Sequence, residues 1–435
     1  MRLISLQKSG SRRTRADQGV CPTIAPQYPV SRKLSDIGLR VCATGPDVID
    51  SSVRRNLMKS CSLALILLVL PAAAQEQKQH FTINVSTPEG QMLQSIGQES
   101  DDDKKLALAQ DFLDKYPKHE GSGWVAGQLE VIYVKQKNYD KALEVGEKAL
   151  ANNPSDLDVA YNALKAAEGK EDPDALKTWS ARTSAIARKI IASTKAPADD
   201  DAKQYLEYVK GVDTYADYAL YSLAVKLQAN PKQLAELGAA LEQQNIKSQY
   251  MLLLSGLYLN ALTQSGQAAK TCPAAEKLAA ANSKDADALV IAADCGLHHN
   301  SLDRAAANAT RAVEAISSRS KPDGVSDSDW ASKKAALVGR ANWIAGVAYG
   351  TLQKWGPADK ALRAALPSIK GDPQLLPSAL FYLGLSNYNL GKVLGDKAKT
   401  REGLAYFQQC AEITSNVQDQ ASKNVRTIKT ELGIR

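Results

Sequence analysis

The sequence has few of the residues from which catalytic and metal sites are usually built. It holds 4 histidines and 6 cysteines in 435 residues. It also lacks a glycine-rich phosphate loop, a nucleophile elbow and a His-Glu-x-x-His zinc motif. Acidic runs such as Asp101–Asp103 do not follow the alternating ligand spacing of a calcium loop. We therefore predict that the chain is not an enzyme and has no catalytic, cofactor-binding or metal-binding residues.

Long apolar runs are also missing. The unbroken apolar run Leu63–Leu70 covers eight residues, whereas a helix needs about 20 residues to span a bilayer. We expect no stable membrane span. The run belongs instead to a pattern that is typical of a secretory signal peptide.

Three consecutive regions make up this pattern. Arg54, Arg55 and Lys59 provide the basic front, Leu63–Leu70 the apolar centre, and the small residues of Ala72–Ala74 the cleavage region. We predict a signal peptide over residues 58–74, cleaved near Ala74 and preceded by a disordered or non-native leader over residues 1–57. The predicted location is periplasmic or secreted, in a bacterium. A short buried helix is the alternative interpretation of the apolar run.

The predicted cleavage changes the charge and the cysteine count. Residues 1–57 contain ten Lys/Arg and four Asp/Glu, and Lys59 adds one base, so this front carries the whole formal charge of +7. The chain from Gln75 onward holds 43 residues of each sign. A neutral chain argues against a nucleic-acid partner. The same cleavage leaves three cysteines: Cys272, Cys295 and Cys410.

Beyond a polar linker at residues 75–86, the chain is predicted to be entirely helical. Thr87-Pro88 places an N-cap residue before a proline at the first helical position. No alternating strand pattern is present, and abundant alanine favours helices that approach closely. Short breaks rich in Pro, Gly, Asn and Asp separate the helical stretches: 115–117, 152–154, 171–173, 229–231 and 371–373.

The clearest internal repeat runs from Gly123 to Leu157. Its first helix has large apolar residues four apart, and its second has small residues four and three apart, so each set forms one stripe along its helix. Pro154 ends the unit. The stripes consist of Leu129 and Tyr133 in the first helix and Ala142, Gly146 and Ala149 in the second.

The segment YDKALEVGEKALANNP, residues 139–154, resembles the second helix of a tetratricopeptide repeat, a unit of about 34 residues with two antiparallel helices. The sequence departs from the family at Glu130, where a small residue is preferred, and at Trp124, which lies two residues ahead of the usual early aromatic. Residues 342–365 and 380–410 carry similar small and aromatic spacings. The resemblance implies a right-handed superhelical α-solenoid of stacked antiparallel helix hairpins, with an extended binding surface rather than a catalytic pocket.

This resemblance divides the chain into three parts. Residues 87–156 form N-terminal repeats, and residues 248–435 form C-terminal repeats with a terminal helix. Residues 157–247 keep helical spacing but lose the signature, so they are either divergent repeats or an irregular helical insert.

Two constellations involve Cys295. With His298 and His299 it could bind a metal ion, but zinc sites usually have three or four protein ligands, and solvated histidines in a turn explain the pair better. Cys272 and Cys295 fall on consecutive helices that pack together in the implied architecture. They form either a disulfide or two small buried thiols.

The resemblance implies a non-catalytic protein-interaction scaffold that binds a peptide or protein partner, with a possible place in envelope assembly or maintenance. The first helix of each hairpin lines the inner groove in the family, and aromatic and Arg side chains are typical anchors of interfaces. The oligomeric state stays open, and packing between repeats is the alternative role for each residue. The predicted partner-binding residues are Trp124, Arg340, Trp343, Phe381 and Tyr388.

A helical enzyme or small-ligand domain is the alternative function. It would be centred on residues 157–247, where aromatic side chains are numerous: Trp179, Tyr205, Tyr208, Tyr215 and Tyr218. A deep pocket with convergent polar groups would favour this alternative, and a smooth open face would favour the scaffold.

Overall fold

A computed structural model of the chain describes residues 83–194, 197–321 and 325–434. The predicted leader, the signal peptide and residues 75–82 of the predicted linker lie outside the described residues. Within them the regular structure consists of seventeen α-helices: α1 Pro88–Gln98, α2 Asp102–Lys115, α3 Ser122–Lys135, α4 Tyr139–Asn152, α5 Leu157–Lys170, α6 Pro173–Ser193, α7 Asp200–Lys226, α8 Pro231–Asn245, α9 Gln249–Gln264, α10 Ala268–Ala281, α11 Ala286–His298, α12 Leu302–Ser318, α13 Asp327–Thr351, α14 Trp355–Ile369, α15 Leu376–Leu394, α16 Lys397–Ala411 and α17 Gln418–Leu432.

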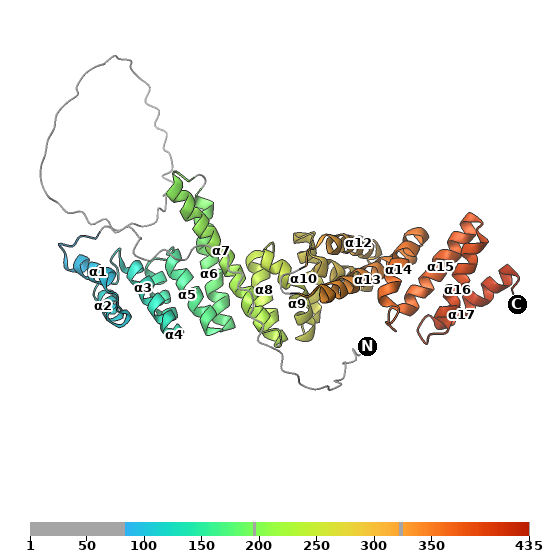
Figure 1. Cartoon of the computed structure of the whole chain (residues 1–435), viewed down its shortest axis with the longest axis horizontal. Coiled ribbons are helices and arrows are strands. Elements are labelled where there is room, and N and C mark those ends of the chain that lie inside the picture. The colour runs from blue at the N-terminus through green and yellow to red at the C-terminus, as the bar shows by residue number, and fades with distance from the viewer. Residues whose placement is uncertain (1–82, 195–196, 322–324, 435) are drawn as a thin grey trace, which may run out of the picture.

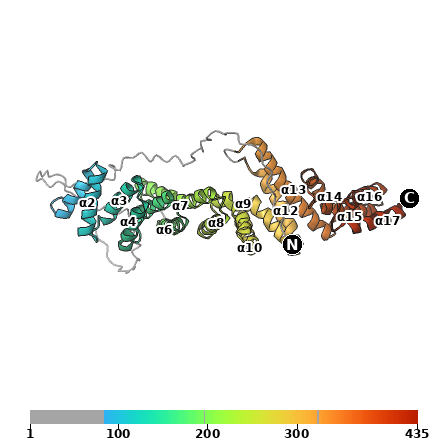
Figure 2. The same ribbon diagram turned by 90° about the horizontal axis from the view of Figure 1, so that it is seen from below.

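The helices form an elongated stack in which each packs against the next along the chain (Figures 1 and 2). The odd-numbered helices from α3 to α15 also contact one another directly, so the first helices of the hairpins form a continuous layer. The expected all-α solenoid of helix hairpins is therefore confirmed. None of the described helices is both long and apolar enough to span a bilayer.

The breaks predicted from the sequence lie at helix ends, where side chains replace missing backbone partners. Thr87 caps α1 by accepting a hydrogen bond from the Gly90 N–H at 3.2 Å, with Pro88 at the first turn. Asp172 and Asn230 cap α6 and α8 in the same way, each followed by a proline. These caps satisfy N–H groups that a helix start leaves free, which explains why the helices begin at these residues.

Small residues set the spacing within and between hairpins. Most of the small repeat positions are buried, and Gly403 is the clearest case, because a Cβ there would lie 2.7 Å from the backbone nitrogen of Tyr388. Ala149 differs from the expectation, since it is half-buried. In α4 the neighbouring Leu150 takes the buried place.

Residues 157–247 continue the stack as helices α5 to α8. The contacts pass from α5 to α6, α7 and α8 and on to α9, as in the rest of the molecule. The helices α6 and α7 are longer than those of the first repeat, with 21 and 27 residues against 14, and their ends project above their neighbours in Figure 1. Residues 157–247 therefore pack as part of the same stack, with two helices that are longer than those of the first repeat.

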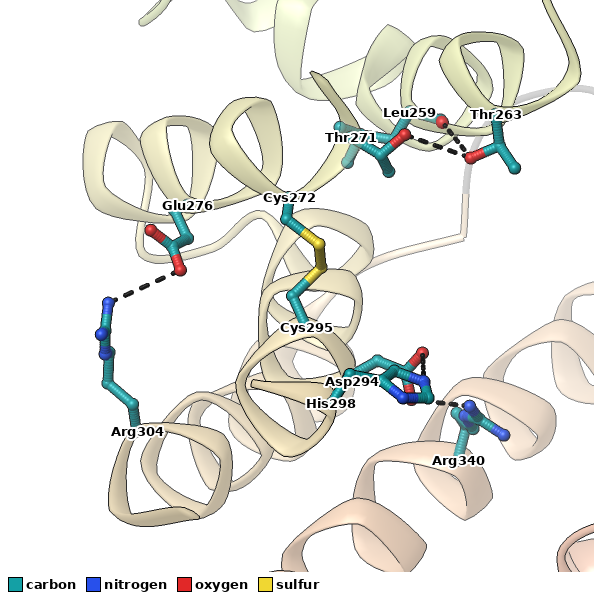
Figure 3. Close-up of a disulfide and its surroundings, with 10 residues drawn as sticks. All are labelled: Leu259, Thr263, Thr271, Cys272, Glu276, Asp294, Cys295, His298, Arg304 and Arg340. Carbon is teal, nitrogen blue, oxygen red and sulfur yellow. Dashed lines mark hydrogen bonds and ion pairs between the residues drawn. A yellow bond between two sulfur atoms is a disulfide. The ribbon is translucent and has the colours of Figure 1, made fainter. Parts of the chain in front are cut away.

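A disulfide joins Cys272 on α10 to Cys295 on α11, with the two Cα atoms 5.8 Å apart. It connects one hairpin to the next, as Figure 3 shows, and an ion pair from Arg304 to Glu276 at 3.5 Å bridges α12 and α10 nearby. The third cysteine, Cys410, is buried, and burial raises the pKa of its thiol to about 11. Two hairpins in the middle of the stack are thus linked covalently.

We predict that a Cys272→Ala/Cys295→Ala variant loses about 3 kcal/mol of unfolding free energy, because the disulfide closes a loop with a sequence separation of 23 and restricts the unfolded chain. Urea unfolding with and without reductant measures this loss. The oxidised wild-type chain should respond to reductant, and the double variant should not. Equal responses would contradict the linkage.

We also predict that Gly403→Ala destabilises the chain by about 1–3 kcal/mol, because its new methyl group would press on the backbone of α15. Gly211→Ala is the matched control. It also lies inside a helix, but a Cβ there meets nothing within 4 Å, so it should stabilise by about 0.5–1 kcal/mol. Thermal unfolding of both variants would show opposite shifts. A loss of similar size in the two would exclude close packing as the cause.

Candidate partner-binding surface

The five predicted partner-binding residues all lie on first helices of hairpins: Trp124 on α3, Arg340 and Trp343 on α13, and Phe381 and Tyr388 on α15. Each is half-buried. They are distributed along the stack and do not form one cluster.

Arg340 and Trp343 are engaged within the chain. The Arg340 guanidinium donates to Asp294 on α11 at 2.7 Å and lies over the Trp343 ring, 4.6 Å from its centroid. The Trp343 indole N–H points to the start of α15 and donates to the Leu375 carbonyl oxygen at 3.1 Å and to Ser378 at 3.0 Å. These contacts hold α11, α13 and α15 in register and leave part of each side chain accessible.

The residues on α15 also have internal contacts. The Phe381 ring packs edge-on against Phe407 of α16, with centroids 5.7 Å apart. The Tyr388 hydroxyl donates to Glu431 of the terminal helix α17 at 2.9 Å. At the other end of the stack, Trp124 packs against the N-terminal core. Each of these residues therefore packs within the chain. Partner binding by them stays a prediction.

The densest aromatic group on the first helices is a set of seven tyrosines, which we call the tyrosine surface. Neighbouring rings follow one another with centroid separations from 5.3 to 6.5 Å. The rings come from the adjacent helices α5, α7 and α9. The members are Tyr161, Tyr205, Tyr208, Tyr215, Tyr218, Tyr221 and Tyr250.

The sequence indicated four of these tyrosines, all on α7, as part of a possible ligand site. It missed Tyr161, Tyr221 and Tyr250, which complete the row, and it wrongly grouped Trp179 with them. Trp179 is 3% exposed and belongs to the core on α6. Tyr208, Tyr215 and Tyr218 recur at helical spacing on one face of α7, which is the sequence signal for the row. The contributions of α5 and α9 depend on tertiary packing.

Two exposed leucines extend the tyrosine surface along α9. Leu253 and Leu257 lie three and seven residues after Tyr250, which places all three on one face of the helix. They are 46% and 39% exposed, and Tyr208 is 39% exposed. Contiguous exposed apolar side chains are typical of protein-interaction sites. We call Leu253 and Leu257 the leucine extension.

Carboxylates hold the phenol groups at one side of the surface. The Tyr208 hydroxyl donates to Asp158 at 2.7 Å, and the Tyr215 hydroxyl donates to Glu168. Burial, followed by the charge of the nearby carboxylate, raises the pKa of both phenols, so they stay protonated donors. Lys165 lies over the Tyr161 ring, 4.3 Å from its centroid. The surface therefore offers ring edges and apolar contact area rather than a reactive nucleophile.

The possible metal constellation is not assembled. The sulfur of Cys295 is bonded to Cys272, and His298 is exposed, with its Nε2 atom 3.7 Å from Asp294. Across the described part of the chain, no group of three His, Cys, Asp or Glu side chains is placed to hold a metal ion.

One open depression lies between α14, α15 and α16, far along the stack from residues 157–247. Its volume is about 450 Å³, and its lining is largely apolar, with Lys370, Gln409 and Glu412 as its polar members. A site for a small ligand was expected among α5 to α8, so this depression does not support that alternative.

Comparisons with known proteins identify no family. No protein-family model matches the chain, and no curated protein matches it significantly. Among solved structures, the chain is similar to the crystal structure of yeast Tom70, with 14% identity and a TM-score of 0.26 over 81% of this chain. It spans 66% of the Tom70 chain.

A second solved structure with a similar relation is the TPR domain of P58(IPK). The identity is 10% and the TM-score 0.23, over 80% of this chain and 99% of that chain. At these scores the two likenesses carry no information about function.

We predict that Tyr215, which is half-buried, ionises only when the chain unfolds in alkali, because burial and the charge of Glu168 raise the pKa of its phenol. Absorbance of tyrosinate, followed together with circular dichroism during alkaline titration, measures this. A Tyr215→Phe variant should lose part of the absorbance step that coincides with unfolding. If the lost absorbance comes from the earlier step, the Tyr215 phenol titrates in the folded chain, which contradicts the prediction.

Proposed function

We propose that the chain is a non-catalytic scaffold that binds a protein or peptide partner on the layer of first helices. The tyrosine surface and its leucine extension carry this proposal. Interfaces are enriched in tyrosine at their centres, and rings already held in place lose little conformational freedom on binding. The half-buried Trp343 and Phe381 extend the same layer toward the C-terminus.

We further propose that the protein acts outside the cytosol, in the periplasm or beyond the cell, with a role in envelope assembly or maintenance. The signal-peptide pattern over residues 58–74 supports export. The disulfide between Cys272 and Cys295 supports an oxidising compartment, because disulfides persist there and are rare in the cytosol.

The binding proposal predicts that Leu253→Ser/Leu257→Ser reduces partner capture at least tenfold, since truncation of central apolar anchors costs more than about 1.4 kcal/mol. The measurement is quantitative capture from envelope extracts by the chain from Gln75. Ile434→Ser is the control, because Ile434 is also apolar and 39% exposed but follows α17, outside the layer of first helices from α3 to α15.

The expected result is loss of the same captured proteins with the first variant and no loss with the control. Undiminished capture by both variants would exclude the leucine extension as the binding site. Trp343→Ala and Phe381→Ala extend the test to the C-terminal half. Their unfolding must be measured alongside, because both side chains also pack between helices.

Export is tested separately by N-terminal sequencing of the protein recovered outside the cytosol. The expected first residue is Gln75, after cleavage at Ala74. A start well before Met58 with no cut near Ala74 would contradict the export proposal.

A further inference from the structure

Glu130 is a carboxyl group placed where an apolar or small residue would be expected. It lies on α3, between the hairpins α3–α4 and α5–α6, and is fully buried. Neither carboxyl oxygen accepts a hydrogen bond of normal geometry among the described residues. The Asn162 amide of α5 approaches the carboxyl and favours its ionised form, but less strongly than burial opposes that form. A buried charge without a partner is strongly unfavourable, so such a group folds in its neutral form.

The neighbouring helices leave space for this carboxyl. Gly146 on α4 faces it, and a Cβ at Gly146 would lie 2.6 Å from Glu130 Oε1. The same Cβ would approach Ala163 of α5 at 3.0 Å and the Trp179 ring of α6 at 3.2 Å. The missing side chain of Gly146 thus accommodates the extra length of Glu130, and three other helices converge on this point.

The charged groups around Glu130 come mainly from α5. Asp156, its N-cap residue, disfavours ionisation of Glu130, and Lys165 favours it. On α4 and α6, the charged neighbours of Gly146 and Trp179 are Glu147 and Arg182, which pair with each other at 2.6 Å. Among the described residues, Lys165 is the cation whose charge acts on Glu130. It is half-buried and lies over the Tyr161 ring.

We propose that Glu130 makes the packing of hairpin α3–α4 against hairpin α5–α6 sensitive to pH. The neutral carboxyl lets the two hairpins pack closely, whereas its ionisation loosens them and draws Lys165 toward it as counter-ion. This pH-sensitive packing is a property separate from partner binding and does not depend on it. Movement of Lys165 would also uncover the Tyr161 ring, and only this consequence rests on the proposed function of the tyrosine surface.

The direction of the pH effect follows from linkage. Burial, followed by the charge of Asp156, raises the pKa of Glu130 well above its usual value of 4.5. The folded chain therefore keeps a proton that the unfolded chain has released. Its stabilising effect is fully present below the unfolded pKa and is lost as the pH rises through the folded pKa. Each unit of separation corresponds to a tenfold change in the unfolding equilibrium.

The first test compares wild-type and Glu130→Gln chains from Gln75 by urea unfolding between about pH 4.5 and 8.5, the range above the carboxyl's ordinary pKa. The wild type should lose stability relative to Glu130→Gln as the pH rises, by up to tenfold per unit in the unfolding equilibrium constant. Glu130→Ala should show the same flattened profile, although the chain is less well packed. Glu144→Gln is the control, because Glu144 lies on α4 with its side chain 63% exposed and should not reproduce the effect.

Hydrogen exchange locates the effect. At the alkaline end of the range, amides of residues 122–193 should exchange faster in the wild type than in Glu130→Gln at the same pH. Amides of α13 to α16 should exchange equally in the two chains. Parallel profiles of stability against pH for wild type and Glu130→Gln would overturn the proposal. A difference in amide exchange spread evenly over the chain would also overturn it.

A double-mutant cycle tests the role of Lys165. Glu130→Gln, Lys165→Met and the double variant are compared at both ends of the pH range. The two sites should couple at alkaline pH, where Glu130 is ionised, and should not couple near pH 4.5, the usual pKa of its carboxyl. Coupling of equal size at both ends would mean contact without charge and would remove Lys165 from the proposal.

Discussion

Each hairpin of this chain can bury its apolar face only against the hairpins on either side, and the rest of the structure depends on that constraint. A pair of helices with 14 residues each is too small to enclose a core of its own. The chain therefore repeats the same contact many times instead of building one centre. Small residues such as Gly403 keep the helices close enough for this contact. The disulfide between α10 and α11 reinforces one of the contacts covalently.

The same constraint leaves one side of the first helices exposed. The first helices must contact each other along the stack, so each uses one side for the core and presents another. On α5, α7 and α9 that other side carries the tyrosine surface and the leucine extension, where the phenols of Tyr208 and Tyr215 donate to Asp158 and Glu168. Elsewhere the accessible aromatics, such as Trp343, also link consecutive repeats. The side chains that we propose for partner contact are therefore also the ones that pack between repeats.

Glu130 shows how the stack accommodates a buried carboxyl at a position where the repeat pattern has a small residue. The carboxyl enters a junction of four helices, and the absence of a side chain at Gly146 provides its space. Its burial there couples packing to a proton, because the neutral form is the one that fits. A departure from the repeat pattern is thus a natural place for regulation, since it changes one junction without changing the others.

The sequence by itself determined the helical class, the helix boundaries at Thr87 and at the Asn-Pro and Asp-Pro breaks, and the repeat of small residues, because capping, proline and helical periodicity are local properties. It also indicated that Cys272 and Cys295 fall on neighbouring helices. Only the tertiary structure showed that residues 157–247 continue the stack, that Tyr161 and Tyr250 join the tyrosines of α7, and that Trp179 is core. These facts depend on which faces of separate helices meet, and that is decided by packing between residues far apart in the chain.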